Sequence, residues 1–291
     1  MITLVKIGGS VLTDKQRPLV FQEEYARQVA ADIRLSGTVP VIVHGTGSWA
    51  KAVGRHFRTE GGWARDATGF QMTALRIRRL QEALAAALRD EGVMCSPMQA
   101  NALFHRTGGV LDLYGTGPLE HLVAAGVSPL LCGDVLVEGP GTFRVVSSDT
   151  VLLTLARRLE VGDCVLATDV DGVWDEDGTL LPEVARPAAA ADDNDRRDVT
   201  GGMSAKVTAA LDIAATGART TIVNGRVRGR LRDALARRPV TGTRVLAPGA
   251  RPPEPGGPGA APGRQDRADQ EDRPQDPEQP RAAALHPAGA Q

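Results

Sequence analysis

Short aliphatic runs alternate with longer amphipathic segments over the first 247 residues of the chain. The runs hold Val, Ile and Leu on consecutive positions, a pattern typical of strands that are covered on both faces. They are ITLVKI (2–7), VPVIVHG (39–45), SPLLCGDVLV (128–137), DCVLATDV (163–170) and ARTTIVNG (218–225). Because helical segments separate these runs, the pattern predicts an α/β fold with a mainly parallel sheet, right-handed crossovers and helices on both faces.

Four amphipathic segments between the runs predict helices. Each ends at or near a glycine, the usual residue just after a helix. They are residues 21–37, 73–92, 147–162 and 201–217. The stretch GPGTFRVVSSD (139–149) has two glycines and an alternating TFRVV, which predicts a β-hairpin inserted before the third helix.

The residues that follow the aliphatic runs are the candidates for ligand binding, because ligands of open parallel sheets bind beyond the carboxyl ends of the strands. These residues are KIGGS, HGTGS, GDV, TDVDG and NG. Four of the five groups place glycine beside a polar or charged residue, which lets the backbone approach a polyanion closely. The sequence therefore predicts a phosphate-binding edge of the sheet.

Charge and cysteine content narrow the function classes. The 34 basic and 35 acidic residues give a formal net charge of -1, so no global field draws the chain to nucleic acid or to an anionic membrane. No apolar run approaches the roughly 20 residues that a membrane-spanning helix needs. Three cysteines without C-x-x-C spacing predict buried free thiols in a reducing cytoplasm, with neither a disulfide framework nor a protein metal site.

The composition changes abruptly at residue 248. Residues 248–291 hold ten of the nineteen prolines and, apart from alanines, one aliphatic residue, Leu285. Such a segment buries too little apolar surface to offset its conformational entropy. We expect a domain over 1–247 and a disordered tail over 248–291, which is either a partner-binding arm or a tolerated extension.

The segment VKIGGSVLTDK carries a candidate phosphate site. Lys6 ends a predicted strand, and Gly8, Gly9 and Ser10 follow it. A lysine and exposed backbone N–H groups suit nucleotide phosphates. The alternative is a common turn beside a solvated lysine.

Two further segments have similar chemistry. In TDVDGVW, Asp169 and Asp171 form either a tight turn or the polar rim of a nucleotide site. In DVTGGMSAKV, Asp198 or Thr200 caps a glycine-rich helix start with Lys206 one turn in, which holds an anion or is a capped surface helix.

The order of six motifs resembles the amino acid kinase family, and within it the isopentenyl phosphate kinase branch, which includes the fosfomycin kinases. The motifs are VKIGGSVLT, VIVHGTGS, LLCGDVL, SSDTVLL, ATDVDGVW and DVTGGMSAKV, and the resemblance runs from Met1 to about Val245. It implies a three-layer αβα sandwich, usually a homodimer, that transfers the γ-phosphoryl group of Mg-ATP to an oxyanion acceptor.

The resemblance also implies roles for individual residues. Lys6 and Lys206 would stabilise charge on the transferring group, and Asp149 would orient the two lysines. The nucleotide would be bound by Lys6, Gly8, Gly9, Ser10, Thr168, Asp169, Asp171, Gly172, Val173, Gly202, Met203 and Lys206. The acceptor would be bound by Gly45, Thr46, Gly47, Ser48, Lys51, Gly133 and Asp134.

One position departs from the branch. After the second glycine loop the branch reads G-S-F-G-H, and its histidine holds the acceptor's phosphate or phosphonate; this chain reads GSWAK, with Lys51 at that position. Either Lys51 binds the anion of a different acceptor, or it faces solvent. The substitution makes a specialised acceptor, such as a phosphonate intermediate or antibiotic, more plausible than isopentenyl phosphate itself.

Three functions are consistent with these motifs. The first is an ATP-dependent kinase for a small phosphate- or phosphonate-bearing metabolite. The second is a carboxylate kinase of the acetylglutamate or aspartate type. The third is a non-catalytic nucleotide- or oxyanion-binding protein of the same fold.

Overall fold

The computed structural model describes residues 1–49, 63–64, 67–186 and 202–247. All of them lie in one compact unit, Met1–Pro252. A second unit, Pro253–Gln291, lies outside the described residues, as does the whole predicted tail 248–291.

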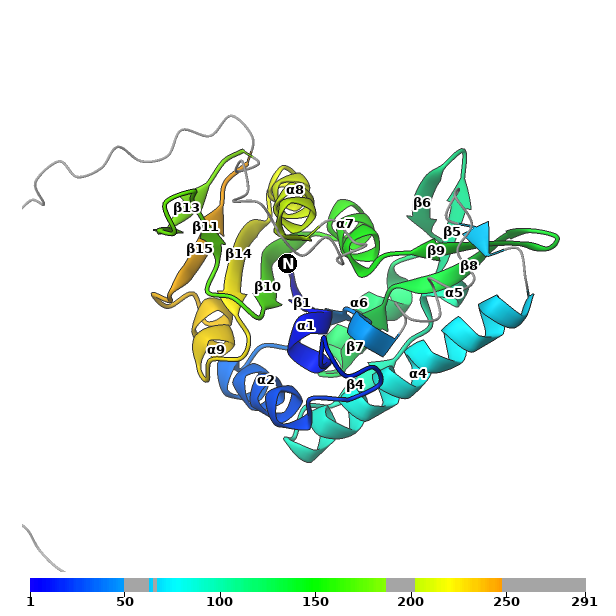
Figure 1. Ribbon diagram of the computed structural model, residues 1–291, viewed down its shortest axis with the longest axis horizontal. Helices are drawn as coiled ribbons and strands as arrows, with labels where there is room; N and C mark the ends of the chain where they lie inside the picture. The colour runs from blue at the N-terminus through cyan, green and yellow to red at the C-terminus, as the bar shows by residue number, and fades with distance from the viewer. Residues whose placement is uncertain (50–62, 65–66, 187–201, 248–291) are drawn as a thin grey trace, which may run out of the picture. The chain divides into compact units, whose positions relative to one another are not determined.

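An eight-stranded sheet forms the centre of the described unit (Figure 1). Its order is β13-β15-β14-β10-β1-β2-β7-β4, and every neighbouring pair is parallel except β14 and β15. The strands are β1 (Ile2–Ile7), β2 (Val41–His44), β4 (Cys95–Pro97), β7 (Ser128–Cys132), β10 (Val161–Thr168), β13 (Glu183–Val184), β14 (Arg219–Asn224) and β15 (Gly242–Val245). The predicted mainly parallel sheet is confirmed.

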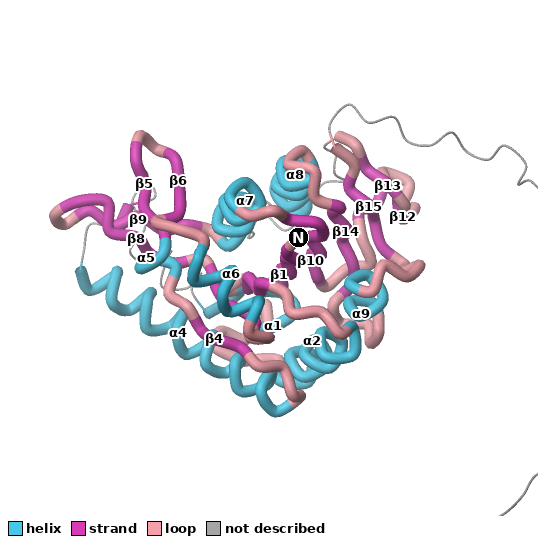
Figure 2. Tube along the Cα trace, turned by 180° about the vertical axis from the view of Figure 1, so that it is seen from behind, coloured by secondary structure: helices cyan, strands magenta, loops and turns pink. Residues whose placement is uncertain are grey.

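Helices cover both faces of this sheet (Figure 2). One layer contains α1 (Gly9–Leu12), α2 (Glu23–Ser36), α4 (Ala67–Asp90) and α9 (Arg230–Leu235). The other contains α6 (Gly117–Ala124), α7 (Ser148–Arg158) and α8 (Gly202–Ala214). Because strand side chains alternate between faces, two separate apolar cores form, and the three-layer αβα architecture is confirmed.

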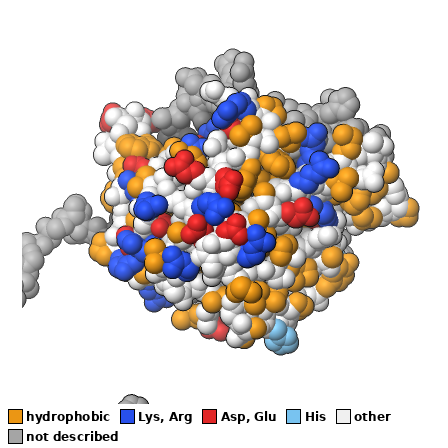
Figure 3. Space-filling model, turned by 90° about the horizontal axis from the view of Figure 1, so that it is seen from below, with side chains coloured by type: hydrophobic (Ala, Val, Ile, Leu, Met, Phe, Trp, Pro, Cys, Tyr) orange, Lys and Arg blue, Asp and Glu red, His pale blue; other side chains and the backbone are white. Residues whose placement is uncertain are grey.

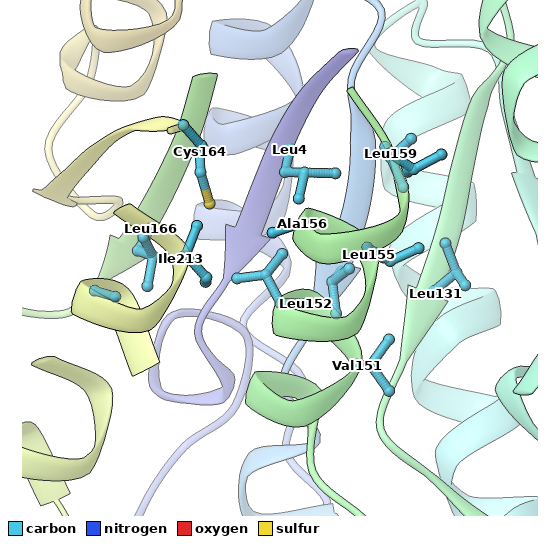
Figure 4. Packing of buried hydrophobic residues seen from close by; sticks show 14 of the residues in the cluster. Leu4, Leu131, Val151, Leu152, Leu155, Ala156, Leu159, Cys164, Leu166 and Ile213 are labelled. Carbon is cyan, nitrogen blue, oxygen red and sulfur yellow. The ribbon is translucent and has the colours of Figure 1, made fainter. Parts of the chain in front are cut away.

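Alternation along β1 decides where its lysine lies. Leu4 belongs to the core beneath α7 and α8, whereas Val5 and Ile7 belong to the core beneath α2 and α4. In Figure 4, Leu4 lies beside Leu152 and Ala156 of α7. Lys6 is two residues after Leu4, so its side chain leaves the sheet toward α7 and α8.

The run 128–137 predicted one strand, but the structure divides it at Gly133. The second half is β8 (Asp134–Gly139), which pairs with β9 (Thr142–Val146) in a three-stranded sheet that also contains β3 (Trp63–Ala64). A Cβ atom on Gly133 would lie 2.6 Å from the Val146 oxygen and 2.7 Å from the Ser148 nitrogen. The chain turns here because glycine permits this close approach, and the predicted hairpin is confirmed as β8–β9.

Five short elements complete the described helices and strands. A hairpin of β5 (Phe104–Thr107) and β6 (Val110–Leu113) follows the single-turn helix α5 (Ala100–Leu103). A second hairpin pairs β11 (Val173–Trp174) with β12 (Leu180–Leu181).

The helix ends agree with the predicted glycine caps in part. Gly37 ends α2 with a φ of 71°, in the left-handed conformation that glycine adopts without strain. The helix α7 instead stops at Leu159, which is extended (φ -108°, ψ 152°) because the chain passes directly into β10. The helix α4 begins at Ala67, six residues before the predicted segment.

Basic and acidic side chains lie next to one another on the face shown in Figure 3. Arg27 of α2 pairs with Glu23 at 3.0 Å and with Asp90 of α4 at 3.3 Å.

No helix in the described ranges is long and apolar enough to cross a bilayer. The three cysteines are free thiols, and Cys132 and Cys164 are buried, as predicted.

Thr243 of β15 ties the segment after β10 to the sheet. Its fully buried hydroxyl accepts a hydrogen bond from the Val173 N–H (2.8 Å) and donates to the Leu181 carbonyl (2.6 Å). We predict that Thr243→Val, which keeps the side-chain shape but removes both bonds, lowers the free energy of unfolding by about 1–3 kcal/mol.

Urea unfolding measures this loss. The matched control is Thr208→Val on the exposed face of α8. Equal losses in the two variants would contradict the role of Thr243.

Candidate active site

The glycine-containing segments after the strands meet at one edge of the sheet. Ile7 of β1 pairs with His44 of β2 and with Ala167 of β10. His44 also pairs with Cys132 of β7, and Ala167 with Val223 of β14. Since these strands are parallel, the loops that follow them start side by side, as the sequence predicted.

Two of these loops touch backbone to backbone. A Cβ atom on Gly45 would lie 2.5 Å from the Gly9 nitrogen, and one on Gly9 would overlap the backbone of Gly47. Gly47 also has a φ of 49°. Any other residue at Gly9 or Gly45 would push the loops apart, so the sequence needs glycine on both sides of this contact.

Thr13 at the end of α1 locks the two loops together. Its hydroxyl donates to the Gly9 carbonyl (2.7 Å) and accepts a hydrogen bond from the Ser48 N–H (3.1 Å). Thr13 is 1% exposed, so solvent does not compete for these bonds. Sequence reasoning missed Thr13 because a threonine after a short helix has no distinctive pattern.

Lys6 and Asp149 form an ion pair between the sheet and α7. Asp149 lies in the first turn of α7, which Ser147 caps by accepting a hydrogen bond from the Thr150 N–H (3.1 Å). Lys6 is 5% exposed, and burial lowers its pKa, while the Asp149 carboxylate opposes that shift. Asp149 therefore offsets part of the cost of burying this ammonium at the ligand edge of the sheet.

Lys206 of α8 lies near this pair. Its charge also lowers the pKa of Lys6, which places the two ammonium groups within electrostatic reach. The helices α7 and α8 pack side by side (Figure 1). The structure thus brings together Lys6, Asp149 and Lys206, which are far apart in the sequence. Gly202 and Met203 open α8, whereas Asp198, Thr200 and Gly201 lie outside the described residues.

Lys15 is a further cation at this edge that sequence reasoning did not single out. Its ammonium lies 3.0 Å from the Asp169 carboxylate. Partial burial raises the pKa of Asp169, but the nearby Ser10 hydroxyl and the ion pair with Lys15 lower it by more, so the net shift is downward. Asp169 thereby connects the segment after β10 to the glycine loop after β1.

The rarity of lysine in this chain is the sequence signal that could have identified Lys15. Of the 34 basic residues, only Lys6, Lys15, Lys51 and Lys206 are lysines, which leaves thirty arginines. Lysine is a compact charge on a slender stem, whereas arginine presents a wide planar fork. In a chain that otherwise uses arginine, all four lysines stand in or beside the glycine motifs.

The remaining residues of TDVDGV serve internal contacts. The Asp171 carboxylate accepts hydrogen bonds from Asn224 (2.8 Å) and Arg230 (2.5 Å), which lower its pKa. Thr168 donates to the Val170 carbonyl within its own turn (2.9 Å). Gly172 and Val173 are buried next to Thr243. These residues shape the edge of the site rather than present free side chains to it.

Asp134 is 1% exposed and anchors the backbone that follows Gly133. Its carboxylate accepts hydrogen bonds from the N–H groups of Val135 (2.8 Å) and Asn101 (3.2 Å), and Arg78 of α4 lies 3.6 Å away. Burial raises the pKa of Asp134 despite these partners. Its contacts join α4, α5 and β8 next to Gly133, and sequence reasoning missed Arg78 because arginines recur throughout α4.

Arg226 supports the Gly8–Ser10 loop, which is the candidate phosphate loop. Its guanidinium donates to the Ser10 carbonyl (2.5 Å) and stacks 4.8 Å from the ring centre of Tyr25. Its backbone N–H donates to the Asn224 side chain (2.9 Å), which also binds Asp171. This chain of contacts connects the loops after β1, β10 and β14, and no sequence motif indicated it.

The loop after β2 contains several buried polar atoms. His44 is fully buried and burial lowers its pKa to about 4, so its imidazole is neutral near pH 7. Its Nδ1 atom is 3.2 Å from the Gly45 carbonyl. Thr46 accepts a hydrogen bond from the Trp49 N–H (3.1 Å), which closes a tight turn over Gly47 and Ser48. Lys51 lies outside the described residues.

The described residues contain no cluster of three His, Cys, Asp or Glu side chains that would hold a metal by themselves. The acidic side chains nearest the glycine loops, Asp149 and Asp169, are each paired with a lysine.

The fold and the loops define a phosphate-binding protein of the αβα class. The model of the amino acid kinase family matches residues 1–224, and the chain belongs to that family. The resemblance noted in the sequence is thus confirmed.

Relatives with this fold include isopentenyl phosphate kinases. One from Haloferax volcanii is 34% identical over 221 residues, covering 74% of this chain and 89% of the relative. One from Methanothermobacter thermautotrophicus is 29% identical over 261 residues, covering 83% and 98%. A solved isopentenyl phosphate kinase structure is 26% identical, has a TM-score of 0.72, and matches 84% of this chain and 100% of its own.

The contacts of Arg226 predict that its substitution changes the KM for ATP more than the KM for the acceptor. Arg226→Met removes a charge-assisted hydrogen bond to the loop that carries Ser10, so we expect the KM for ATP to rise about tenfold or more while the acceptor KM changes less than about twofold. Steady-state kinetics with each substrate varied in turn measures both constants.

The control is Arg228→Met, an exposed arginine two residues further on. Arg226→Lys, which keeps the charge, should recover part of the loss. If both methionine variants behaved alike, Arg226 would have no part in nucleotide binding.

Proposed function

We propose that the protein is an ATP-dependent kinase that transfers the γ-phosphoryl group to a small acceptor bearing a phosphate or phosphonate group. The observation that carries the proposal is the contact between the Gly8–Ser10 and Gly45–Ser48 loops, with the Lys6–Asp149 pair beside it. Family membership and the isopentenyl phosphate kinase relatives support the same reaction.

The first loop suits the ATP phosphates. Gly8, Gly9 and Ser10 follow the strand that carries the buried Lys6, and Gly9 and Ser10 begin α1. The Gly8 N–H donates to the Ala167 carbonyl (2.8 Å), so the N–H groups of Gly9 and Ser10 would bind a phosphate. Gly202, Met203 and Lys206 at the start of α8 would bind the phosphates from the other side. Thr168, Asp169, Asp171, Gly172 and Val173 would form the rim at the nucleotide.

The second loop suits the acceptor. Gly45, Thr46, Gly47 and Ser48 lie against the first loop, and Lys51 follows them in the sequence. Gly133 and Asp134 would shape the far wall, Asp134 through the backbone that it holds. The contact between the loops keeps the two phosphorus groups at the short separation that transfer requires.

The chemical step needs positioning and positive charge. An acceptor oxygen forms a bond to the γ-phosphorus while the bond from that phosphorus to the β,γ-bridging oxygen breaks and its electron pair leaves with ADP. A phosphate or phosphonate acceptor is ionised near neutral pH, so no general base is required. Lys6 and Lys206 would neutralise charge that develops on the transferring oxygens, and Asp149 would hold Lys6 in place.

Mg²⁺ is proposed as the ion that accompanies ATP. The homodimer, the cytoplasmic location and the boundary between a kinase domain (1–247) and a tail (248–291) stay predictions. Light scattering on the full chain and on a chain that ends at residue 247 measures the assembly and tests that boundary.

An acceptor panel separates the candidate functions. We expect ADP release with isopentenyl phosphate or a phosphonate such as fosfomycin to exceed that with N-acetylglutamate or aspartate by at least about tenfold, since a polar site rejects a ligand that leaves its groups unpaired. Faster turnover of a carboxylate would overturn the proposal in favour of the carboxylate kinase. ATP binding without turnover of any acceptor would favour the binding protein.

The proposed role of Lys206 is tested by substitution. Lys206→Ala removes a contact to developing phosphoryl charge, worth about 3 kcal/mol, so kcat should fall about a hundredfold with a modest change in the KM for ATP. The control is Asp212→Ala, an exposed position on the same helix. A kcat within about threefold of the parent would rule out the catalytic role of Lys206.

A further inference from the structure

Two buried hydrogen-bond donors in the loop after β2 lack partners among the described residues. They are the indole Nε1–H of Trp49 and the hydroxyl of Ser48. Buried polar groups in folded proteins are almost always hydrogen-bonded, and each exception needs an explanation. An indole N–H can only donate, so its missing partner has to be an acceptor atom.

The position of these donors points to a ligand. Trp49 and Ser48 end the turn that begins at Thr46, and the backbone N–H of Ser48 is already bound to Thr13. The turn rests on Gly9 through Gly47, so both side chains belong to the loop that meets the phosphate-loop candidate. A molecule that binds between the two loops would supply the acceptor atoms that these buried donors lack.

The number of donors matches the chemistry of a phosphorus oxyanion. A phosphate monoester or phosphonate has three terminal oxygens, of which one attacks the γ-phosphorus and two remain. A carboxylate has two oxygens, of which only one remains. Two neutral donors on adjacent residues can therefore each bind a separate non-reacting oxygen of a phosphate or phosphonate, whereas with a carboxylate both would have to share one oxygen.

We propose that the Trp49 indole N–H and the Ser48 hydroxyl bind the two non-reacting oxygens of the acceptor's phosphate or phosphonate, which makes Trp49 a specificity-determining residue. This inference rests on the proposed kinase function and deepens it.

The variant that isolates the N–H group is Trp49→Phe, which keeps an aromatic ring. We expect the KM for the preferred acceptor to rise about tenfold to a hundredfold, the loss expected for a hydrogen bond to a charged group, while the KM for ATP stays within about twofold. The matched control is Trp174→Phe, because Trp174 is 42% exposed on β11 and should leave both constants unchanged.

A spectroscopic measurement tests the same bond without turnover. The chain has three tryptophans, at 49, 63 and 174, so a ¹⁵N-labelled sample gives three indole N–H signals, and Trp49→Phe assigns the first by its disappearance. We expect isopentenyl phosphate or fosfomycin, added without ATP, to move the Trp49 signal downfield and to leave the Trp174 signal in place.

The outcomes separate this inference from the function on which it rests. If the parent enzyme phosphorylates the acceptor but the Trp49 signal does not move, and Trp49→Phe keeps its acceptor KM within about twofold, the donor role of Trp49 is wrong and the kinase stands. If the parent phosphorylates no phosphate or phosphonate, the proposed function fails and this inference fails with it. Thermal unfolding of Trp49→Phe shows whether a kinetic loss reflects a folded enzyme.

Discussion

The backbone contact between Gly9 and the Gly45–Gly47 segment is the constraint on which the rest of the site depends. A single Cβ atom at Gly9 would overlap the opposite loop, so the loops that follow β1 and β2 are held as close as two polypeptide backbones can lie. Thr13 then fixes their register with two hydrogen bonds. Phosphoryl transfer needs the donor phosphorus and the attacking oxygen held close together in line, and in the proposed reaction this contact would set the separation of the two loops that bind them.

Electrostatics complements this geometry. Burying the Lys6 ammonium costs free energy, and the Asp149 carboxylate at the start of α7 offsets part of that cost. Lys206 lies nearby and has no ion-pair partner among the described residues. The brace formed by Arg226, Asn224 and Asp171 lies outside the contact itself and keeps three loops in register. Rigid neutral contacts and ion pairs thus hold the loops in place, and in the proposed function Lys206 and the unpaired donors would bind the ligands.

Much of the fold was predictable because strand and helix periodicities are local. The five aliphatic runs all became strands, and parallel pairing placed their carboxyl ends together. Prediction failed at Gly133, where a continuous apolar run changes sheets because of a steric contact with Val146 and Ser148 that is remote in sequence. Arg78, Arg226 and Thr13 were missed for the same reason: each acts through a partner that only folding brings near.

The sequence by itself determined the alternation of strands and helices, the glycine motifs and their order, and therefore the amino acid kinase family. Those features follow from residue type and spacing along the chain. Tertiary structure alone decided that Asp149 pairs with Lys6, that Asp134 and Asp171 are used to hold the frame, and that Ser48 and Trp49 keep buried donors unpaired. Hydrogen-bond satisfaction depends on distances between remote segments, and no local pattern encodes those distances.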